Sequence, residues 1–165
     1  MKRCVIAIGL ALTACGGGDD QGSTPGSRIE AAAVASGVIA DPAKVDPNGT
    51  FGRDSDRVCI LGEGRQRRIG IYSYYGDDLT CTARGRAEVD GETLDIRLGE
   101  GDRCRIKARF DGNAITFPGS TAEACASFCD APASLAGLSV ERFSDSPAEA
   151  QSLRGGDGTA LCPSS

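Results

Sequence analysis

Two Asp-Gly pairs, Asp90-Gly91 and Asp111-Gly112, constrain the fold of this chain more than any other feature. They interrupt runs in which apolar and polar residues alternate, from residue 79 to residue 117. Asp-Gly favours the tight two-residue turns of antiparallel hairpins, and alternation is typical of strands with one buried face. This stretch is therefore predicted to be an antiparallel meander.

A two-residue turn at the first Asp-Gly pair sets the expected register of the first hairpin. It places Ala87 opposite Leu94 on an inner face and Arg84 beside Arg97 on the outer face. Because side chains alternate with a period of two, a slip of one residue would expose the whole apolar face to water. The sequence therefore determines which face each residue occupies.

Three further links keep the same sidedness: the second Asp-Gly pair, a longer link at residues 99–103 and a loop at residues 76–78. The expected pairs are Ala108 with Ile115, Leu98 with Cys104, Arg97 with Arg105, Ile71 with Ala83, and Ser73 with Cys81. Agreement across several links is stronger evidence for a fold than any single propensity.

The expected fold is mainly β, an antiparallel up-and-down meander or half-barrel of five to six strands. The remaining expected strands span residues 57–61, 67–75 and 138–143. Ser120 with Glu123 forms a capping-box signature, which predicts a short helix ending at about Cys129. We expect this helix to pack on the inner face of the meander and to be held there by disulfides.

Composition divides the chain into five expected parts. They are a signal peptide at residues 1–14, a flexible tether that begins with Cys15 at 15–28, a helix and loop segment at 29–56, the meander and helix domain at 57–143, and a polar, loosely ordered tail at 144–165.

The start of the chain has the features of an export signal. A basic beginning precedes an apolar run at residues 5–12 that is too short to span a membrane as a helix. The following Leu-Thr-Ala-Cys, residues 12–15, resembles the lipobox of bacterial lipoprotein precursors. The resemblance implies cleavage before Cys15, acylation of Cys15 and anchoring in the cell envelope, and Gly16 favours the outer membrane. The alternative is an ordinary signal peptide with Cys15 as a disulfide partner.

The charge of the chain argues against a nucleic-acid partner. The 23 acidic residues exceed the 18 basic residues, for a net charge of −5. Loss of Lys2 and Arg3 with the signal peptide would leave 16 basic residues and a net charge of −7. Nucleic-acid binding requires a basic footprint, which this balance does not provide.

Six cysteines remain for disulfides if Cys15 is lipidated and Cys4 leaves with the signal peptide. They are Cys59, Cys81, Cys104, Cys125, Cys129 and Cys162. An even number in an oxidising compartment indicates three disulfides. A metal or redox site is disfavoured, because the chain has no histidine and no Cys-x-x-Cys pair.

The predicted register restricts how these cysteines can pair. Cys81 and Cys104 face inward near the same end of the sheet, but two strand spacings, ~10 Å, are too long for a disulfide. Cys125 and Cys129 lie one helical turn apart, so each can reach one of the two sheet cysteines. The first and last of the six, Cys59 and Cys162, are then expected to pair with each other.

The sequence predicts no catalytic residue, metal site or cofactor. The usual base for serine or cysteine nucleophiles is missing, because the chain has no histidine. Residues 46–56 resemble a calcium-binding loop loosely, but their glycines are misplaced and no glutamate closes the loop.

The outer face of the meander is the candidate binding surface. Arg84, Arg97 and Arg105 are expected to align in one cross-strand row, with ~5 Å between neighbours, beside Tyr72 and Tyr74 on the adjoining strand. Arginine binds carboxylates with two parallel hydrogen bonds, and tyrosine offers rigid contact area. The alternative is a solvated face whose charges discourage aggregation.

These features predict a lipid-anchored, non-catalytic protein of the cell envelope with a binding or envelope-maintenance role. Its expected partners are the membrane, through the anchor, and a protein or an anionic glycan. One alternative is a small periplasmic inhibitor of a cell-wall enzyme, similar to lysozyme inhibitors, with residues 62–64 or 76–78 as the inhibitory loop. The second is an envelope hydrolase, which alanine substitutions at Ser73, Ser120 and Ser127 would test.

Overall fold

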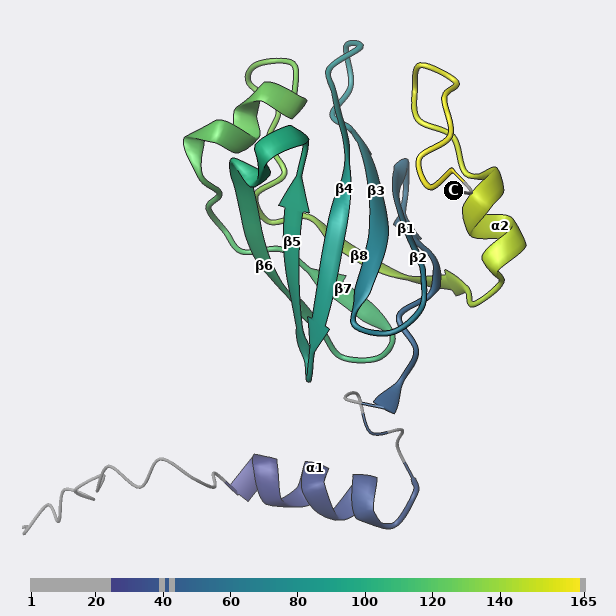
Figure 1. Ribbon diagram of the computed structural model, residues 1–165. Helices are drawn as coiled ribbons and strands as arrows, with labels where there is room; N and C mark the ends of the chain where they lie inside the picture. The colour runs from purple at the N-terminus through teal and green to yellow at the C-terminus, as the bar shows by residue number, and fades with distance from the viewer. Residues whose placement is uncertain (1–24, 39–40, 42–43, 164–165) are drawn as a thin grey trace, which may run out of the picture. The chain divides into compact units, whose positions relative to one another are not determined.

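The structure is a computed structural model that describes residues 25–38, 41 and 44–163 (Figure 1). It consists of two units, Met1–Val38 and Ile39–Ser165, which are described separately. The described part of the first unit contains the helix α1 (Pro25–Ala35), which has no buried residue. Within the described ranges, no helix combines the length and the apolar character needed to cross a membrane. The predicted signal peptide and Cys15 lie outside these ranges.

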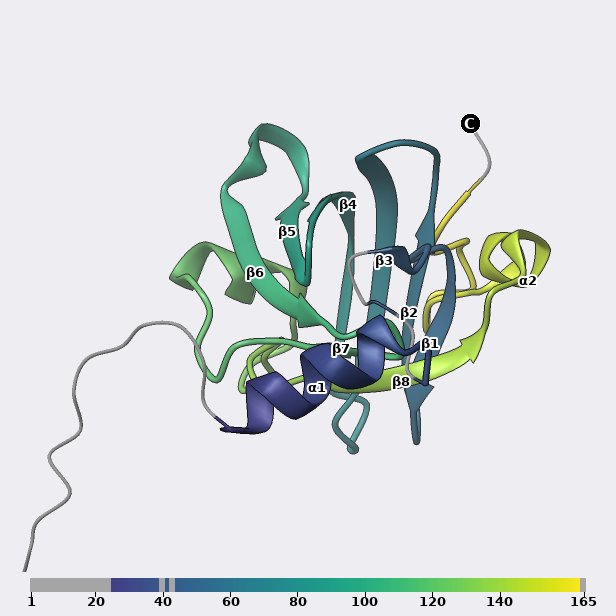
Figure 2. The same cartoon turned by 90° about the horizontal axis from the view of Figure 1, so that it is seen from below.

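The second unit is a closed antiparallel barrel of eight strands. Each strand pairs with its neighbours along the sequence, and β1 closes the barrel by pairing with β8 (Figures 1 and 2). The strands are β1 (Gly49–Arg53), β2 (Asp56–Leu61), β3 (Gln66–Tyr74), β4 (Thr80–Asp90), β5 (Thr93–Leu98), β6 (Cys104–Phe110), β7 (Ala114–Thr116) and β8 (Ser139–Ser144).

The mainly β, antiparallel prediction is confirmed, but the predicted half-barrel of five to six strands is wrong. The loop expected before residue 57 contains β1, whose pairing with β8 closes the barrel. Gly49 and Gly52 lower the strand propensity of this segment, so propensity did not predict β1. Both are required by close approach, since a Cβ at Gly52 would lie 2.8 Å from the backbone oxygen of Asp56.

Alternation of apolar and polar residues explains the sidedness of the barrel. Along β6, buried and exposed side chains alternate without a break. The inward side chains form one apolar core, in which Phe51, Ile71, Leu94, Ile96 and Phe110 are 0% exposed. The faces predicted from the period of two are therefore confirmed.

Two of the predicted strand registers are confirmed. Between β3 and β4, Ile71 lies opposite Ala83, and Ser73 lies opposite Cys81. Between β5 and β6 the observed pairs also match the expected ones, including Leu98 with Cys104 and Arg97 with Arg105.

The registers at the two Asp-Gly pairs are shifted by two residues from the prediction. Ala87 lies opposite Ile96 rather than Leu94, because Asp90 still belongs to β4 and the turn consists of the next two residues. Gly91 then occupies the first turn position with a φ of 58°, where hairpin turns favour glycine. A shift of two keeps every side chain on its face but changes its neighbours.

The second Asp-Gly pair forms a longer turn than expected. Phe110 lies opposite Ile115, so the predicted pair of Ala108 with Ile115 is wrong. The Asp111 carboxylate accepts hydrogen bonds from the backbone N–H groups of Asn113 and Ala114, at 3.0 and 2.7 Å. These bonds stabilise a wider loop, since an Asp side chain can replace a backbone acceptor in a turn.

One end of the barrel is covered by residues 118–138, which two disulfides attach to the sheet. Cys129 is bonded to Cys81, and Cys125 is bonded to Cys104. The prediction that each helix cysteine pairs with a sheet cysteine is confirmed, and the structure adds which pairs with which. The helix in this segment is the 3₁₀ helix η3 (Glu123–Phe128), and no side chain caps its first turn. The predicted capping box is therefore wrong. The helix ends before Cys129 because that residue is extended and forms a β-bridge with Cys81.

The opposite end of the barrel is closed by two aromatic rings and one arginine. Phe51 and Phe110 pack edge to face, with their centroids 6.1 Å apart. The guanidinium carbon of Arg142 lies 4.7 Å from the centroid of Phe51 and 5.7 Å from that of Phe110. Arg142 thus places a cation on the aromatic faces at this end.

The C-terminal part of the chain packs on the outside of the barrel. It contains α2 (Pro147–Ser152), whose Ser146 cap accepts a hydrogen bond from the Glu149 N–H group. Ala150, Leu161 and Cys162 are buried against the outer side of β2, and Cys162 is bonded to Cys59 as expected. The predicted loosely ordered tail is therefore wrong. Its sequence is polar, but it covers an outer apolar patch of β2.

Candidate functional site

Four arginines form one cross-strand row on the outer face of β3, β4, β5 and β6. Arg68 lies opposite Arg86, Arg86 lies opposite Arg97, and Arg97 lies opposite Arg105. Because neighbouring strands are ~4.8 Å apart, this arginine row extends over about 14 Å. It presents the planar guanidinium groups that bind carboxylates.

The arginine row corrects the predicted one. Arg97 and Arg105 lie side by side as expected, but Arg84 is not their neighbour. The shift of two residues between β4 and β5 puts Arg86 in its place. The pairing of β3 with β4 then adds Arg68, which the predicted row did not include.

Arg84 instead attaches the C-terminal segment to the barrel. Its Nε donates a hydrogen bond to the Ala160 carbonyl at 2.8 Å, and its guanidinium also contacts the Thr159 hydroxyl. The Asp157 carboxylate lies 3.8 Å from the same guanidinium. Hydrogen bonds from Thr159, with a smaller contribution from Arg84, lower the pKa of Asp157.

The two predicted tyrosines point outward, but neither joins the arginine row. Tyr72 lies opposite Thr82 as expected, yet it is half-buried under the C-terminal segment, where Gly156 lies against its ring. Tyr74 is 42% exposed, near the end of β3. Tyr72 is four residues along β3 from Arg68, a distance of about 13 Å.

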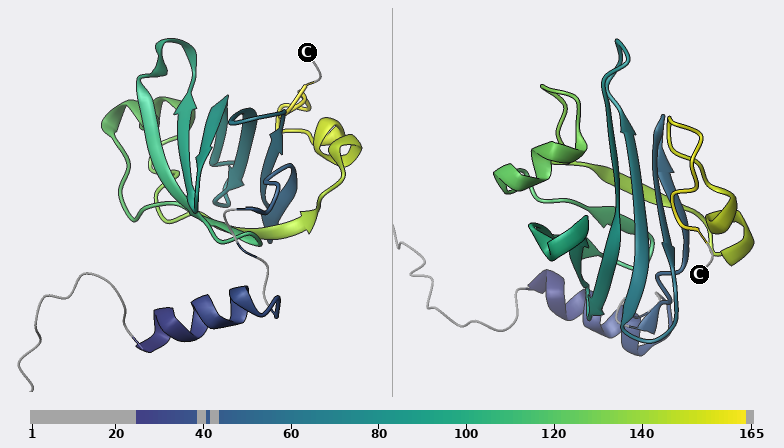
Figure 3. Two further views of the ribbon diagram at one scale, coloured as in Figure 1. Left: turned by 60° about the horizontal axis from the view of Figure 1, so that its bottom comes forward. Right: turned by 45° about the horizontal axis from the view of Figure 1, so that its top comes forward.

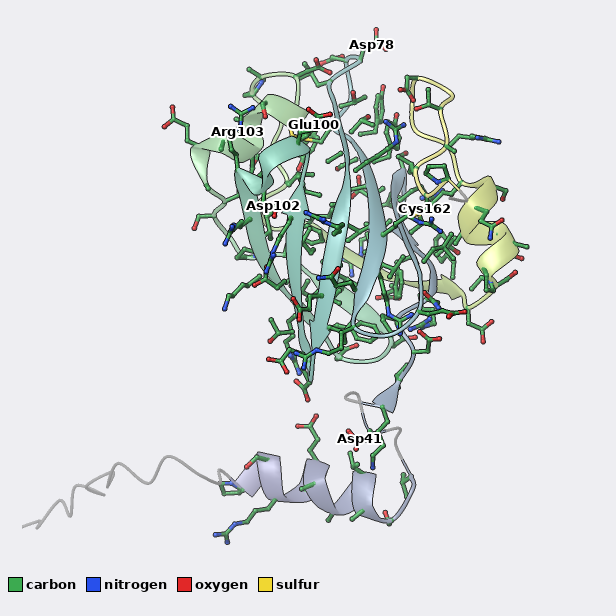
Figure 4. All side chains as sticks on the ribbon, viewed as in Figure 1. Asp41, Asp78, Glu100, Asp102, Arg103 and Cys162 are labelled. Carbon is green, nitrogen blue, oxygen red and sulfur yellow. A yellow bond between two sulfur atoms is a disulfide. The ribbon has the colours of Figure 1, made fainter. Side chains whose placement is uncertain are left out.

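One aspartate contacts three members of the arginine row. Asp102 belongs to η2 (Glu100–Asp102), in the link between β5 and β6 (Figure 4). Its carboxylate lies 3.1 Å from Nη2 of Arg86 and 3.9 Å from Nη1 of Arg97, and its carbonyl accepts a hydrogen bond from Nε of Arg105. The alternation of apolar and polar residues does not indicate this contact, because Asp102 lies in a link outside the strands.

The neighbouring row of side chains on the same face contains charges of both signs. Glu88 lies opposite Asp95, and Asp95 lies opposite Lys107. Both acidic residues also approach Arg97, at 3.9 Å from Glu88 and 3.5 Å from Asp95. Arg97 therefore has more acidic neighbours than the adjacent Arg105, which lies at the β6 end of the arginine row and is exposed.

A groove of about 550 Å³ adjoins the arginine row on the side of α2. Its lining includes Asn48, Leu61, Arg67, Arg68, Arg86 and Gln151, and it is called the α2 groove here. Since Arg68 and Arg86 belong to both, the groove and the row form one continuous surface. The size is within the range of small-ligand sites, about 300 to 1,000 Å³.

The residues of the two alternative functions lie elsewhere. The hydroxyl of Ser73 donates a hydrogen bond to the Asp56 carboxylate at 2.6 Å, and that of Ser127 donates to the Ala124 carbonyl. The loop with Asp78 at its tip projects beyond the end of the barrel (Figures 3 and 4). Such a projection is the geometry that an inhibitory loop would need.

Comparison of the chain with protein-family models, curated proteins and solved structures finds no match. The arginine row and the α2 groove are therefore the features from which a function can be inferred. Together they offer guanidinium groups on a rigid sheet, which suits recognition of carboxylates.

Proposed function

We propose that this chain is a lipid-anchored, non-catalytic protein of the cell envelope whose barrel binds a carboxylate-bearing partner. The alignment of four arginines on adjacent strands carries this proposal. Each guanidinium can form two parallel hydrogen bonds with a carboxylate, and the strands fix the spacing between the guanidinium groups. The partner is a protein or a glycan that presents several acidic groups along about 14 Å.

The charges of the arginine row support binding in a second way. Like charges directly opposite each other on a sheet repel. Asp102 compensates this repulsion in part, but the side chain of Arg86 remains 63% exposed and Arg105 is exposed as well. A carboxylate-bearing partner would relieve the remaining repulsion. Because these groups are exposed, salt should weaken the complex.

Photocrosslinking in intact cells tests the proposed binding surface. A photoreactive residue in place of Arg97 should capture a partner that the same probe at Asp111, on the far turn, does not. Adding Arg105→Glu should lower the yield at position 97 at least fivefold, because it reverses a charge in the row. Lys107→Glu is the matched control on the same strand and should change the yield less than twofold.

Other crosslinking results would contradict this proposal. Equal capture at positions 97 and 111 would show that the arginine row is solvated surface. Capture by a third probe at Asp78, with none at positions 97 and 111, would favour the inhibitor function, since that loop projects from the barrel (Figure 4).

The lipid anchor is tested by Cys15→Ala. This change should move the protein from the membrane fraction to the soluble fraction, because acyl chains contribute about 0.8 kcal/mol per buried methylene. Cys4→Ala is the control and should leave the protein in the membrane fraction. Fractionation and the intact mass of the mature chain are the measurements. A Cys15→Ala protein that stays membrane-bound without acyl groups would overturn the proposed anchor.

A further inference from the structure

The two middle arginines of the arginine row already hold a carboxylate of the chain itself. Oδ1 of Asp102 lies 3.1 Å from Nη2 of Arg86, and Oδ2 lies 3.9 Å from Nη1 of Arg97. The Asp102 carbonyl also accepts a hydrogen bond at 3.2 Å from Nε of Arg105. One carboxylate at this position therefore bridges the arginines of β4 and β5, which lie opposite each other.

The segment that carries this carboxylate is anchored to η3 at both ends. It comprises residues 99–103 and is called the η2 link here. At one end, Gly99 packs against the ring of Phe128, since a Cβ on Gly99 would lie 2.7 Å from Cζ of that ring. At the other end, the link leads into Cys104, which is bonded to Cys125. Between these anchors, no residue of η2 is buried.

Open space lies between the η2 link and η3. A cavity of about 350 Å³ is lined by Glu100 and Arg103 of the link and by Ala124 and Ser127 of η3. Segments with few buried apolar contacts open locally at a low cost in free energy. Movement of Asp102 away from the arginine row would therefore break its polar contacts without disrupting any apolar packing of η2.

Asp102 differs in this respect from two other carboxylates near the arginine row. Glu88 and Asp95 approach Arg97 at 3.9 and 3.5 Å, but they belong to β4 and β5, whose paired backbones hold them in place. They screen the charge of the arginines and stay where they are. Asp102 lies outside the strands, so its carboxylate can be exchanged for that of a partner.

Resting on the proposed function, we infer that Asp102 is an internal competitor for the carboxylate site of the arginine row and determines which partners bind. A partner displaces Asp102 and places its own carboxylate between Arg86 and Arg97, while the η2 link turns about its anchors. A tethered competitor acts at an effective concentration in the millimolar range. A single carboxylate is therefore too weak to displace Asp102. A partner with several carboxylates succeeds, because it also gains contacts with the exposed Arg105.

Titration of the purified full chain in detergent with hexaglutamate tests this inference, with hexaglutamine as the uncharged match. Asp102→Asn removes the competing charge and should tighten hexaglutamate binding at least tenfold. Asp95→Asn removes a charge at a similar distance from Arg97 and should tighten the binding less than threefold. Hexaglutamine should bind neither variant.

The NMR signal of the Gly99 N–H group reports displacement in the unsubstituted chain. This group donates a hydrogen bond to the Arg84 carbonyl at 3.0 Å and lies beside Phe128, so its signal is sensitive to movement of the η2 link. Hexaglutamate should move the Gly99 signal toward its position in ligand-free Asp102→Asn. The signal of Gly112, on the far turn, should not move. Millimolar acetate should leave the Gly99 signal unchanged, because a single carboxylate does not displace Asp102.

Three results would overturn the inference. Hexaglutamate binding with an unchanged Gly99 signal would show that Asp102 is a fixed counter-ion of the arginine row. An equal gain from Asp102→Asn and Asp95→Asn would reduce the effect to net charge. In both cases the proposed function would stand, provided that Arg105→Glu weakens the binding. Hexaglutamate binding to neither the unsubstituted chain nor Asp102→Asn would contradict the carboxylate site itself. The crosslinking at position 97 would then test the proposed function separately.

Discussion

Replacing both Cys59 and Cys162 by alanine should lower the free energy of unfolding by about 4.7 kcal/mol. This disulfide joins residues 103 positions apart, so it restricts the unfolded chain more than the other two. The bond also holds the C-terminal segment against β2, where Leu61 and Leu161 are buried. Its loss should therefore expose the segment as well as destabilise the barrel.

The disulfide between Cys104 and Cys125 provides the matched control. It joins residues 21 positions apart, and its removal should cost about 3.3 kcal/mol on the same chain-entropy argument. Urea unfolding of the two double-alanine variants measures the difference, and limited proteolysis should cleave residues 145–163 early in the first variant alone. An equal loss in both variants would show that loop length does not govern these crosslinks.

The sequence was sufficient for the sidedness of the strands but not for all their pairings. A period of two decides whether a residue faces the core, and this holds for any shift by two residues. The exact position of the turn decides which residues lie opposite each other on the two strands. Because the turn lies at Gly91 and the residue after it, Arg86 rather than Arg84 joins Arg97. One turn thus changed the membership of the candidate site.

The outer cover of the barrel could have been predicted from β2. Val58, Cys59, Ile60 and Leu61 are consecutive apolar residues, and all four are buried. A strand with one solvated face would alternate, so such a run indicates that something packs on the second face. The C-terminal segment is mostly polar, because only a few of its residues, Ala150, Leu161 and Cys162, are buried against β2. Its overall composition therefore does not indicate that it covers this face.

The α2 groove could not be predicted from the sequence for a related reason. Its walls come from β2, β3, β4 and α2, and α2 lay in a segment expected to be loosely ordered. The hydrogen bonds from Asn48 and Arg67 to the Gly62 carbonyl, which join residues 14 and five positions apart, are likewise visible only in the structure. Hydrogen-bond satisfaction is a property of three-dimensional contacts, which no local pattern encodes.

Arg142 shows how a charged residue can be part of a barrel end. Its guanidinium donates to three backbone carbonyls: Asn48 at 2.8 Å, Asp46 at 3.0 Å and Gly112 at 3.2 Å. It joins the entry of β1 to the turn between β6 and β7. Burial lowers the pKa of Arg142, while Asp145 and Asp46 act in the opposite direction. An arginine begins so far above neutral pH that this group stays charged.

Arg142→Met should therefore lower the free energy of unfolding by about 3 to 4 kcal/mol, because it leaves these carbonyls without a charged donor. Methionine preserves the apolar stem over Phe51 and Phe110, so the loss reports on the guanidinium. Arg53→Met is the control. Arg53 forms a solvent-exposed ion pair with Glu141, and loss of this pair should lower the free energy of unfolding by less than about 1 kcal/mol. Equal losses in urea unfolding would mean that the two aromatic rings close this end of the barrel without the cation.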